Sequence, residues 1–427
     1  MVRFALAVAM YTCACWAVAG DYRAGADTYR QYLKSLQAGD RLLLEPGEYR
    51  LGLPLHDMAG MSSRPIVIEA ADPANPPRFV AQAGANTVSL ANVRYLVLRR
   101  LELDGRNLPV DAVKAEGHSA YADFVTLEGL YIHDYAASQQ NVGISTKCPA
   151  FGWTIRGNRI ERVGTGIYLG DSDGSDPFVA GVIEDNRIGD TLGYNLQIKH
   201  QRSRPLHMPE SGMRHDTLIR RNYFSKRASQ PGPLARPNLL LGHFPPAGPG
   251  ENDRYLVFNN VFFENVSEAL MQGEGNLVVF GNVFVNRHGP ALRIQPHNDV
   301  PKTVYLFNNT VLAAGTGISL INRTAPRWPQ VVFANAIFAD VPLVGGRDAG
   351  NVTDAYDQAG RYLRRPYAEP EAFDVAPRQI MRYRDIEPWP ALPFGPLGVD
   401  GHALVPGEVG AVTSAAAMPS TIPGARP

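Results

Sequence analysis

Short runs of hydrophobic residues recur along the middle of the chain, and each run is interrupted by one asparagine. A typical unit is Ile155–Ile160, in which apolar and polar residues alternate around Asn158. The unit recurs between residues 153 and 338, with successive asparagines about 22 to 38 residues apart. The central asparagines are Asn158, Asn186, Asn222, Asn260, Asn282, Asn309 and Asn335. Repeats of this length indicate stacked supersecondary units whose loops vary in length.

A second short strand follows each of the first six of these units, as in Gly166–Gly170 and Ala291–Gln295. Its side chains should alternate between the two faces of the strand, with a period of two. We expect one set to point inward, namely Ile167, Leu196, Leu239, Leu270, Leu292 and Ile318. The set expected to point outward comprises Tyr168, Gln197, Leu240, Met271, Arg293 and Ser319. The region has no long helical patterns, which argues against a sheet with helical crossovers.

The repeats predict an all-β chain that forms a single-stranded right-handed parallel β-helix. Asparagine tolerates the left-handed backbone that a one-residue bend needs, and stacked asparagine amides can hydrogen-bond from coil to coil. An amphipathic helix at residues 28–38 is expected to cap the first coil. We predict the β-helix with its N-terminal cap over residues 21–355, and a C-terminal wrapping extension with a loose tail over 356–427.

The N-terminal segment and the charge balance narrow the setting in which the protein works. Arg3, the apolar run Phe4–Val18 and small residues up to Ala19 have the pattern of a signal peptide, predicted over residues 1–20. The run is too short for a membrane span, so we predict a periplasmic or secreted protein, which we expect to be a monomer. Lys plus Arg and Asp plus Glu number 41 each, so the chain has no overall bias toward nucleic acid.

Polar residues gather just after the second strands, where stacked coils bring them into one outward column. Reading along the chain, the column contains Lys147, Asp171, Lys199, His200, His243, Glu274, Arg293 and His297, and the loop after Lys199 adds Arg202. Neighbouring coils are about 4.8 Å apart, close to the length of one sugar ring, so a linear polysaccharide can follow the stack. A locally basic face on a neutral protein suits an anionic polysaccharide; a solvated surface with chance basic residues is the alternative.

The segment Gly39–Tyr49 (GDRLLLEPGEY), followed by asparagine-bend coils, resembles the right-handed, pectate-lyase-like β-helix polysaccharide lyases and epimerases, and most of all the alginate lyase and chondroitinase B family. The resemblance covers roughly residues 28–340 as architecture. It implies that Lys199, within the letters LQIKH, is the catalytic base, that His243 matches a family histidine, and that Arg293 lies in a matching strand. Gly242 stands where the family has an arginine before that histidine.

Lyase chemistry on a uronic acid has three needs: a neutralised carboxylate, a base for the C5 proton, and an acid for the departing O4 oxygen. We predict an exported polysaccharide lyase that cleaves a uronic-acid-containing glycan by β-elimination. The catalytic residues in this hypothesis are Lys199, His243 and His200. The substrate-binding residues are Arg293, Arg202, Tyr168, Gln197, Glu274 and His297. Three alternatives stay open: a mannuronan-type C5-epimerase, a glycoside hydrolase using Asp171, Asp173 or Glu274, and a non-catalytic glycan-binding β-helix protein.

An acidic loop offers ligands for Ca²⁺, the candidate cofactor. The loop has Asp171, Asp173 and Asp176 at a spacing that suits a hard cation bound by oxygens, and a turn rich in Asp and Gly is the competing interpretation. The paired glutamates of the family's calcium site are missing, and Asn195 alone matches one of its ligands. The predicted metal set is therefore Asp171, Asp173, Asp176 and Asn195.

Overall fold

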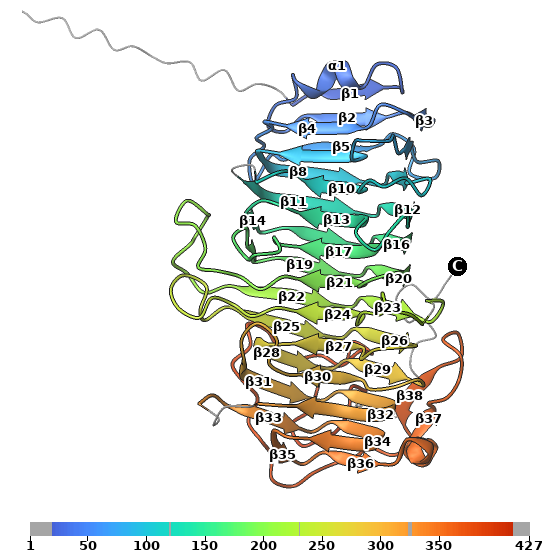
Figure 1. Cartoon of the computed structure of the whole chain (residues 1–427), viewed down its shortest axis with the longest axis vertical. Coiled ribbons are helices and arrows are strands. Elements are labelled where there is room, and N and C mark those ends of the chain that lie inside the picture. Colours follow the sequence, from blue (N-terminus) through green and yellow to red (C-terminus); the bar gives the residue numbers. More distant parts are fainter. Residues whose placement is uncertain (1–18, 119–120, 230, 323–326, 413–427) are drawn as a thin grey trace, which may run out of the picture.

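The computed structural model describes residues 19–118, 121–229, 231–322 and 327–412. Most of the predicted signal peptide and the tail from residue 413 lie outside the described residues, so export and a periplasmic or secreted location remain predictions. The described chain winds into a right-handed parallel β-helix, as predicted, whose coils stack along the long axis of the molecule (Figure 1). No helix among the described residues is long and apolar enough to cross a bilayer.

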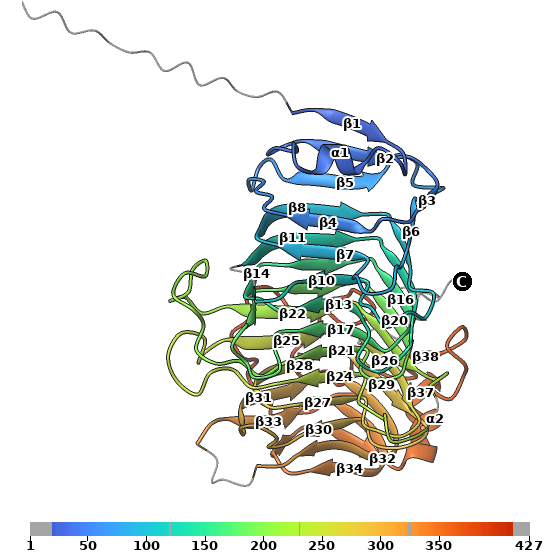
Figure 2. The ribbon, with the colours of Figure 1, turned by 45° about the horizontal axis from the view of Figure 1, so that its top comes forward.

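One face of the solenoid is a parallel sheet that runs through the whole stack (Figure 2). Each strand on this path pairs with the corresponding strand of the next coil. In order, the strands are β1 (Asp21–Ala24), β2 (Arg41–Leu44), β5 (Ile66–Ala70), β8 (Val93–Arg99), β11 (Ala122–Glu128), β15 (Thr154–Arg156), β19 (Val182–Glu184), β22 (Asp216–Arg220), β25 (Arg254–Phe258), β28 (Gly275–Phe280), β31 (Pro301–Phe307), β33 (Gln330–Phe333) and β35 (Arg347–Ala349). Two short strands, β14 (Ala150–Phe151) and β18 (Phe178–Val179), extend it beside β11.

A second face follows the first bend of each coil, which carries a ladder asparagine from Asn158 onward, and a third face follows the second. The second face contains β3 (Glu48–Tyr49), β6 (Arg78–Val80), β9 (Glu102–Asp104), β12 (Tyr131–Tyr135), β16 (Arg159–Val163), β20 (Arg187–Thr191), β23 (Tyr223–Lys226), β26 (Val261–Asn265) and β29 (Val283–Asn286). The third contains β4 (Leu53–His56), β7 (Val88–Ala91), β10 (Val113–Ala115), β13 (Val142–Thr146), β17 (Thr165–Leu169), β21 (Leu196–Ile198), β24 (Leu239–Leu241), β27 (Met271–Gly273) and β30 (Leu292–Ile294). Near the end of the stack β32 (Thr310–Leu320) and β34 (Ala336–Val344) serve both faces, and β36 (Val352–Asp354) closes the second.

The predicted asparagines lie in register and form one continuous ladder of buried hydrogen bonds. Six of the seven amides donate from Nδ2 to Oδ1 of the next predicted asparagine over 2.8–3.0 Å. The same Oδ1 atoms accept the backbone N–H of the preceding asparagine, as Asn260 does from Asn222 at 2.9 Å. The ladder ends one step beyond the predicted set, where Asn335 donates to Asn351 at 2.9 Å. It satisfies polar groups at a corner that would otherwise be buried without partners.

The prediction that asparagine itself adopts the left-handed backbone is wrong. The positive φ belongs to the residue before each ladder asparagine, for example Asp185 at 57°, Arg221 at 54° and Gly281 at 61°. The bend must come one residue early because the asparagine side chain has to point into the corner to reach its neighbours. A short polar or glycine residue most readily tolerates the strained position that precedes it.

The inward and outward sets of the third face are confirmed except in one coil. Ile167 pairs with Leu196, and Leu196 with Leu239, all of them fully buried. In the next coil Met271, not Leu270, pairs with Leu239, so Met271 points inward and Gln272 takes the outward position. The alternation was ambiguous there because Leu270 and Met271 are both apolar, and both are buried.

The two ends of the solenoid are covered by different structural elements. The helix expected over residues 28–38 is shorter, since α1 spans only Arg30–Leu33, and Tyr29 closes the first coils from the inside. At the other end η1 (Tyr356–Gln358), α2 (Ala359–Tyr362), β37 (Leu363–Arg365) and β38 (Asp374–Pro377) lie against the second face. The extension also covers an outward column of stacked rings, namely Phe258, Phe280, Phe307 and Phe333, with Trp389 and Phe394 packed on it.

Replacing Asn260 by Ala should reduce the free energy of unfolding by roughly 3 kcal/mol or more, because several buried donors and acceptors would lose their partner at once. Denaturant unfolding followed by circular dichroism measures the change. Asn252→Ala, at an exposed loop position, is the control and should change stability by less than about 0.5 kcal/mol. Equal effects of the two substitutions would contradict a stabilising role for the ladder.

Candidate active site

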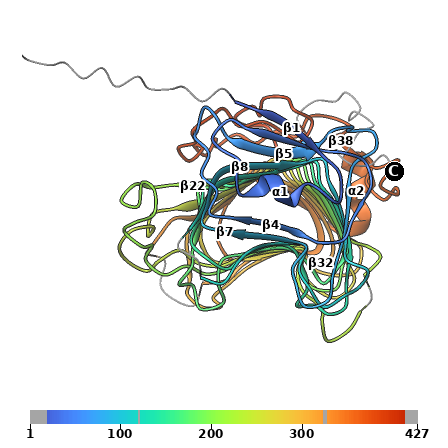
Figure 3. The same cartoon turned by 90° about the horizontal axis from the view of Figure 1, so that it is seen from above.

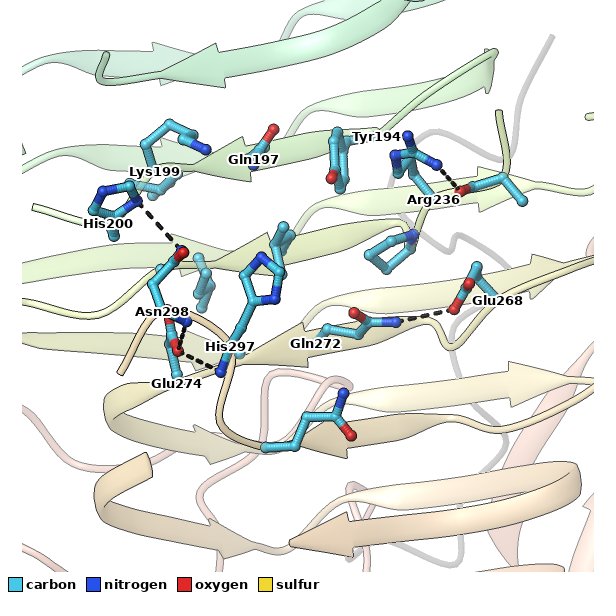
Figure 4. Close-up of a pocket in the computed structure, with 18 residues that line it drawn as sticks. Tyr194, Gln197, Lys199, His200, Arg236, Glu268, Gln272, Glu274, His297 and Asn298 are labelled. Carbon is cyan, nitrogen blue, oxygen red and sulfur yellow. Dashed lines mark hydrogen bonds between the residues drawn. The ribbon is translucent and has the colours of Figure 1, made fainter. Parts of the chain in front are cut away.

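The outward surface of the third face is hollowed into a pocket of about 220 Å³ across β21, β24 and β27, with the loop after β30 along one side. Figure 4 shows its polar lining, with Lys199 and His200 at one end and Tyr194 and Arg236 at the other. Gln197 lies between the two ends, and Gln272, Glu268, Glu274, His297 and Asn298 complete the polar rim. The pocket therefore collects side chains that are up to about a hundred residues apart in the sequence.

Lys199 follows directly on β21, and its side chain points into the pocket as predicted. Burial lowers the pKa of its ammonium group, and the more distant carboxylates Asp171 and Glu274 oppose this shift. In the described part of the chain no carboxylate lies within 4.0 Å of its Nζ. Lys147, on the same side of the solenoid, instead lies 3.9 Å from Asp171 and 3.9 Å from the centre of the Tyr168 ring. Lys199 is thus the lysine available to a ligand.

Gly242 has a structural reason to lack the arginine that the sequence resemblance calls for. It sits in the coil after Lys199, and its N–H bonds to the carbonyl of Ile198 at 2.9 Å. A Cβ at this position would lie 2.2 Å from the backbone nitrogen of His200, which no side chain can tolerate. The backbone that carries His200 therefore crosses the place where the arginine would begin, and the guanidinium of this pocket has to come from elsewhere.

His200 and His243 lie together, with ring centres 5.3 Å apart and nearly parallel planes. His200 lines the pocket, and its Nδ1 accepts a hydrogen bond from Asn298 at 3.4 Å (Figure 4). Burial lowers the pKa of His200, and the positive charge of Lys199 adds to the shift. His243 is buried behind it and donates from Nδ1 to the carbonyl of Phe244 at 2.7 Å. Of the two predicted histidines, only His200 is thus placed to touch a ligand.

Glu274, predicted to bind substrate, is occupied by the protein itself. Its side chain is only 2% exposed. One carboxylate oxygen accepts the backbone N–H groups of His297, Asn298 and Asp299 at 2.9, 2.9 and 3.0 Å. Its other oxygen accepts the N–H of His243 at 3.4 Å. Glu274 therefore fastens the loop that brings His297 and Asn298 to the rim of the pocket.

Tyr194 and Arg236 form the other end of the pocket, and neither was predicted from the sequence as a site residue. Burial raises the pKa of the Tyr194 hydroxyl, and the neighbouring Arg236 guanidinium opposes the shift. Arg236 donates to the carbonyl of Ala235 at 2.6 Å, and among the described residues no carboxylate lies within 4.0 Å of it. Both residues stand in loops just before strands, where the repeat gives no register. Tyr194 lies two residues before β21 and Arg236 three residues before β24, so the two are offset by one position in successive coils.

The remaining predicted binding residues lie around the pocket rather than together in it. Gln197 lines the pocket, and Tyr168 is its outward neighbour in the preceding coil, beneath Lys147. Arg293 pairs in register with Gln272 and lies 4.0 Å from Glu268, beyond the rim. Arg202 is exposed and 3.4 Å from Asp173. Tyr168 and Arg293 thus lie on the strands before and after those that line the pocket.

The four residues proposed as metal ligands do not meet. Asp173 faces Arg202, and Asn195 is buried, donating to Thr191 at 3.1 Å and to the carbonyl of Ser225 at 3.3 Å. Asp171 and Asp176 converge instead with His118, their ligand atoms all within 4.8 Å of one another.

The group around Asp171 does not fit Ca²⁺. His118 hydrogen-bonds Asp176, and the ammonium of Lys147 lies 3.9 Å from Asp171, so each of the two carboxylates already has a partner from the protein. Ca²⁺ prefers six to eight oxygen ligands, whereas this group offers two carboxylates and an imidazole. We derive no catalytic step through a metal.

Replacing Glu274 by Gln should lower the free energy of unfolding by about 2–4 kcal/mol, because an amide group cannot accept three backbone N–H bonds as a carboxylate oxygen does. Hydrogen exchange should rise at residues 296–299. Glu251→Gln, at an exposed position, is the control. Unchanged exchange in the loop together with unchanged stability would contradict the anchoring role.

No family model and no curated protein sequence matches the chain. Solved structures with a similar shape include an alginate lyase of family PL6, with 13% identity, a TM-score of 0.47, and coverage of 78% of this chain and 53% of that chain. A second is the pectate lyase Pel9A, with 11% identity, a TM-score of 0.41 and coverage of 79% of each chain. A third is the A-module of a mannuronan C-5 epimerase from Azotobacter vinelandii, with 15% identity, a TM-score of 0.38, and coverage of 80% of this chain and 96% of that chain. This chain thus spans about half the length of the alginate lyase. These three structures belong to the group of polysaccharide lyases and epimerases that the sequence resembles.

Proposed function

We propose that the protein is a polysaccharide lyase that cleaves a uronic-acid-containing glycan by β-elimination, with Lys199 as the base. One observation carries the proposal: a single pocket holds a lysine and an arginine at opposite ends, and in the described residues neither has a carboxylate within 4.0 Å. A uronate needs a cation at its carboxylate and a base at the adjacent C5 proton. Lys199 supplies the base at one end of the pocket, and Arg236 at the other end offers a cation to the carboxylate of an adjoining sugar unit.

In the proposed reaction Gln197, beside Lys199, donates to the carboxylate of the reacting uronate and makes its C5 proton more acidic, while Arg236 pairs with the carboxylate of an adjoining sugar unit. Neutral Lys199 takes this proton, and the C5–H electron pair forms the C4–C5 double bond as the bond from C4 to O4 breaks. The departing O4 then takes that proton from the Lys199 ammonium, which restores the free amine. His200 is the auxiliary group beside Lys199, and its Nδ1 lies 3.4 Å from the side-chain amide of Asn298. The lowered pKa of Lys199 favours the free amine that removal of the C5 proton needs near neutral pH.

The geometry gives less support to a hydrolase. An inverting or retaining glycosidase needs two carboxyl groups facing the scissile bond. Glu274 is held by backbone amides, Asp171 lies near Lys147, and Asp173 lies near Arg202. A C5-epimerase would use the same lysine and arginine, and it differs from the lyase in returning a proton to C5 instead of expelling O4.

Incubation with alginate, pectate, glycosaminoglycans and bacterial exopolysaccharides should give the ultraviolet absorbance of an unsaturated uronate with at least one of them. Lys199→Ala should lower that rate by at least about 100-fold, because a positioned base contributes this much. Lys147→Ala is the matched control, since its ammonium is engaged by Asp171 and Tyr168, and it should keep most of the activity. No absorbance with any glycan, or equal losses in the two variants, would overturn the proposal.

The pH profile tests the protonation state of the base. Lys199 acts as the free amine, so kcat/KM should rise with pH through an apparent pKa below the ordinary lysine value of 10.5. The direction follows from the sign of the shift, because burial disfavours the ammonium form. Initial rates at a series of pH values, with stability checked at each, give the profile. A rate that falls steadily over the same range would contradict a lysine base.

A further inference from the structure

Lys226, at the end of β23, is a buried lysine with no role in the reaction as described above. Its side chain is 2% exposed, and no carboxylate of the described residues lies within 4.0 Å of Nζ. The register between β23 and β26 shifts at this residue, an irregularity that leaves Lys226 opposite Asn265. Burying an ammonium group is costly, so its position calls for an explanation.

The ammonium of Lys226 donates to the backbone carbonyls of Gly193, at 2.6 Å, and of Arg236, at 3.0 Å. The first carbonyl directly precedes Tyr194, and the second belongs to Arg236 itself. Asn265 donates to the same Arg236 carbonyl at 2.8 Å. One buried side chain therefore joins the two loop segments that form one end of the pocket.

We propose that Lys226 is the positioning residue of this end of the pocket: it fastens the segments that carry Tyr194 and Arg236, and it adds a second positive charge behind them for an anionic sugar. The proposal rests on the proposed function for the identity of the ligand, a uronate carboxylate. The fastening of the two segments does not depend on the proposed function, because it is a property of the protein alone.

The charges around Lys226 make the second part measurable. Burial and the nearby Arg236 lower the pKa of Lys226 to about 8, and Glu268 opposes the shift. A carboxylate bound at Arg236 adds a negative charge nearby, which favours the ammonium form and raises that pKa. Binding at pH 8 should therefore take up a fraction of a proton at Lys226.

The first experiment compares Lys226→Met with Lys114→Met, a lysine of β10 that lies 3.3 Å from Asp111. Hydrogen exchange should rise in residues 191–196 and 233–238 of Lys226→Met only, with the other coils unchanged as a check that the protein is folded. Unchanged exchange in both segments overturns the inference, whatever the substrate. A rise in exchange without any glycan product would leave the fastening intact and count against the proposed function.

The second experiment uses Lys199→Met to prevent turnover and measures binding of a uronate oligosaccharide by calorimetry at pH 8 in buffers of different ionisation enthalpy. Adding Lys226→Met should weaken binding about 10-fold and abolish the Lys226 share of proton uptake. Adding Lys114→Met should change neither. Equal proton uptake with and without Lys226 would overturn the charge role.

Discussion

The buried amide ladder at one corner of the solenoid is the constraint on which the rest of the structure depends. Each ladder asparagine fixes the register of its coil against the next through its Oδ1 and Nδ2 atoms, so a coil cannot slip without breaking several hydrogen bonds. Loops of very different length can then leave the stack and return to it. The strands between them keep their place, and in the view along the axis they superpose (Figure 3).

That register is what assembles the pocket. Lys199, Gly242 and Glu274 follow one another in successive coils although 75 residues separate the first from the last. Gly242 leaves space between Lys199 and Glu274. The carboxylate of Glu274 accepts hydrogen bonds from the backbone of the loop that carries His297. Long loops then place His200 at one end and Arg236 at the other. Arg162, Arg220 and Arg254 elsewhere on the solenoid pair with carboxylates, whereas among the described residues Lys199 and Arg236 have none within 4.0 Å.

The sequence predicted the features that obey the repeat and missed those that lie outside it. The asparagine register and the outward direction of Lys199 follow from the period of the pattern. The slip at Leu270 and Met271 arose because two adjacent apolar residues leave the alternation undecided. The left-handed backbone was assigned to asparagine instead of the preceding residue. The pattern shows which residue type recurs in every unit, but it does not show which residue has a positive φ.

Loops account for the rest of what could not be predicted. Tyr194 and Arg236 precede strands by two or three residues, where no period applies. The acidic loop has a ligand-like spacing, but its aspartates face His118, Lys147 and Arg202, which come from other coils. In the sequence, Lys226 looks like an ordinary residue at the end of a strand. Only the structure shows that its ammonium is buried between the backbones of two loops.

The most direct test of the central claim is a nuclear magnetic resonance spectrum of a uronate glycan after incubation with the protein in D₂O. Elimination by Lys199 predicts new olefinic H4 signals, loss of the C5 proton in the sugar residues that carry them, and no deuterium at C5 of intact sugar residues. Deuterium at C5 of an uncleaved chain would show epimerisation. New reducing ends without olefinic signals would show hydrolysis, and either result would contradict elimination by Lys199.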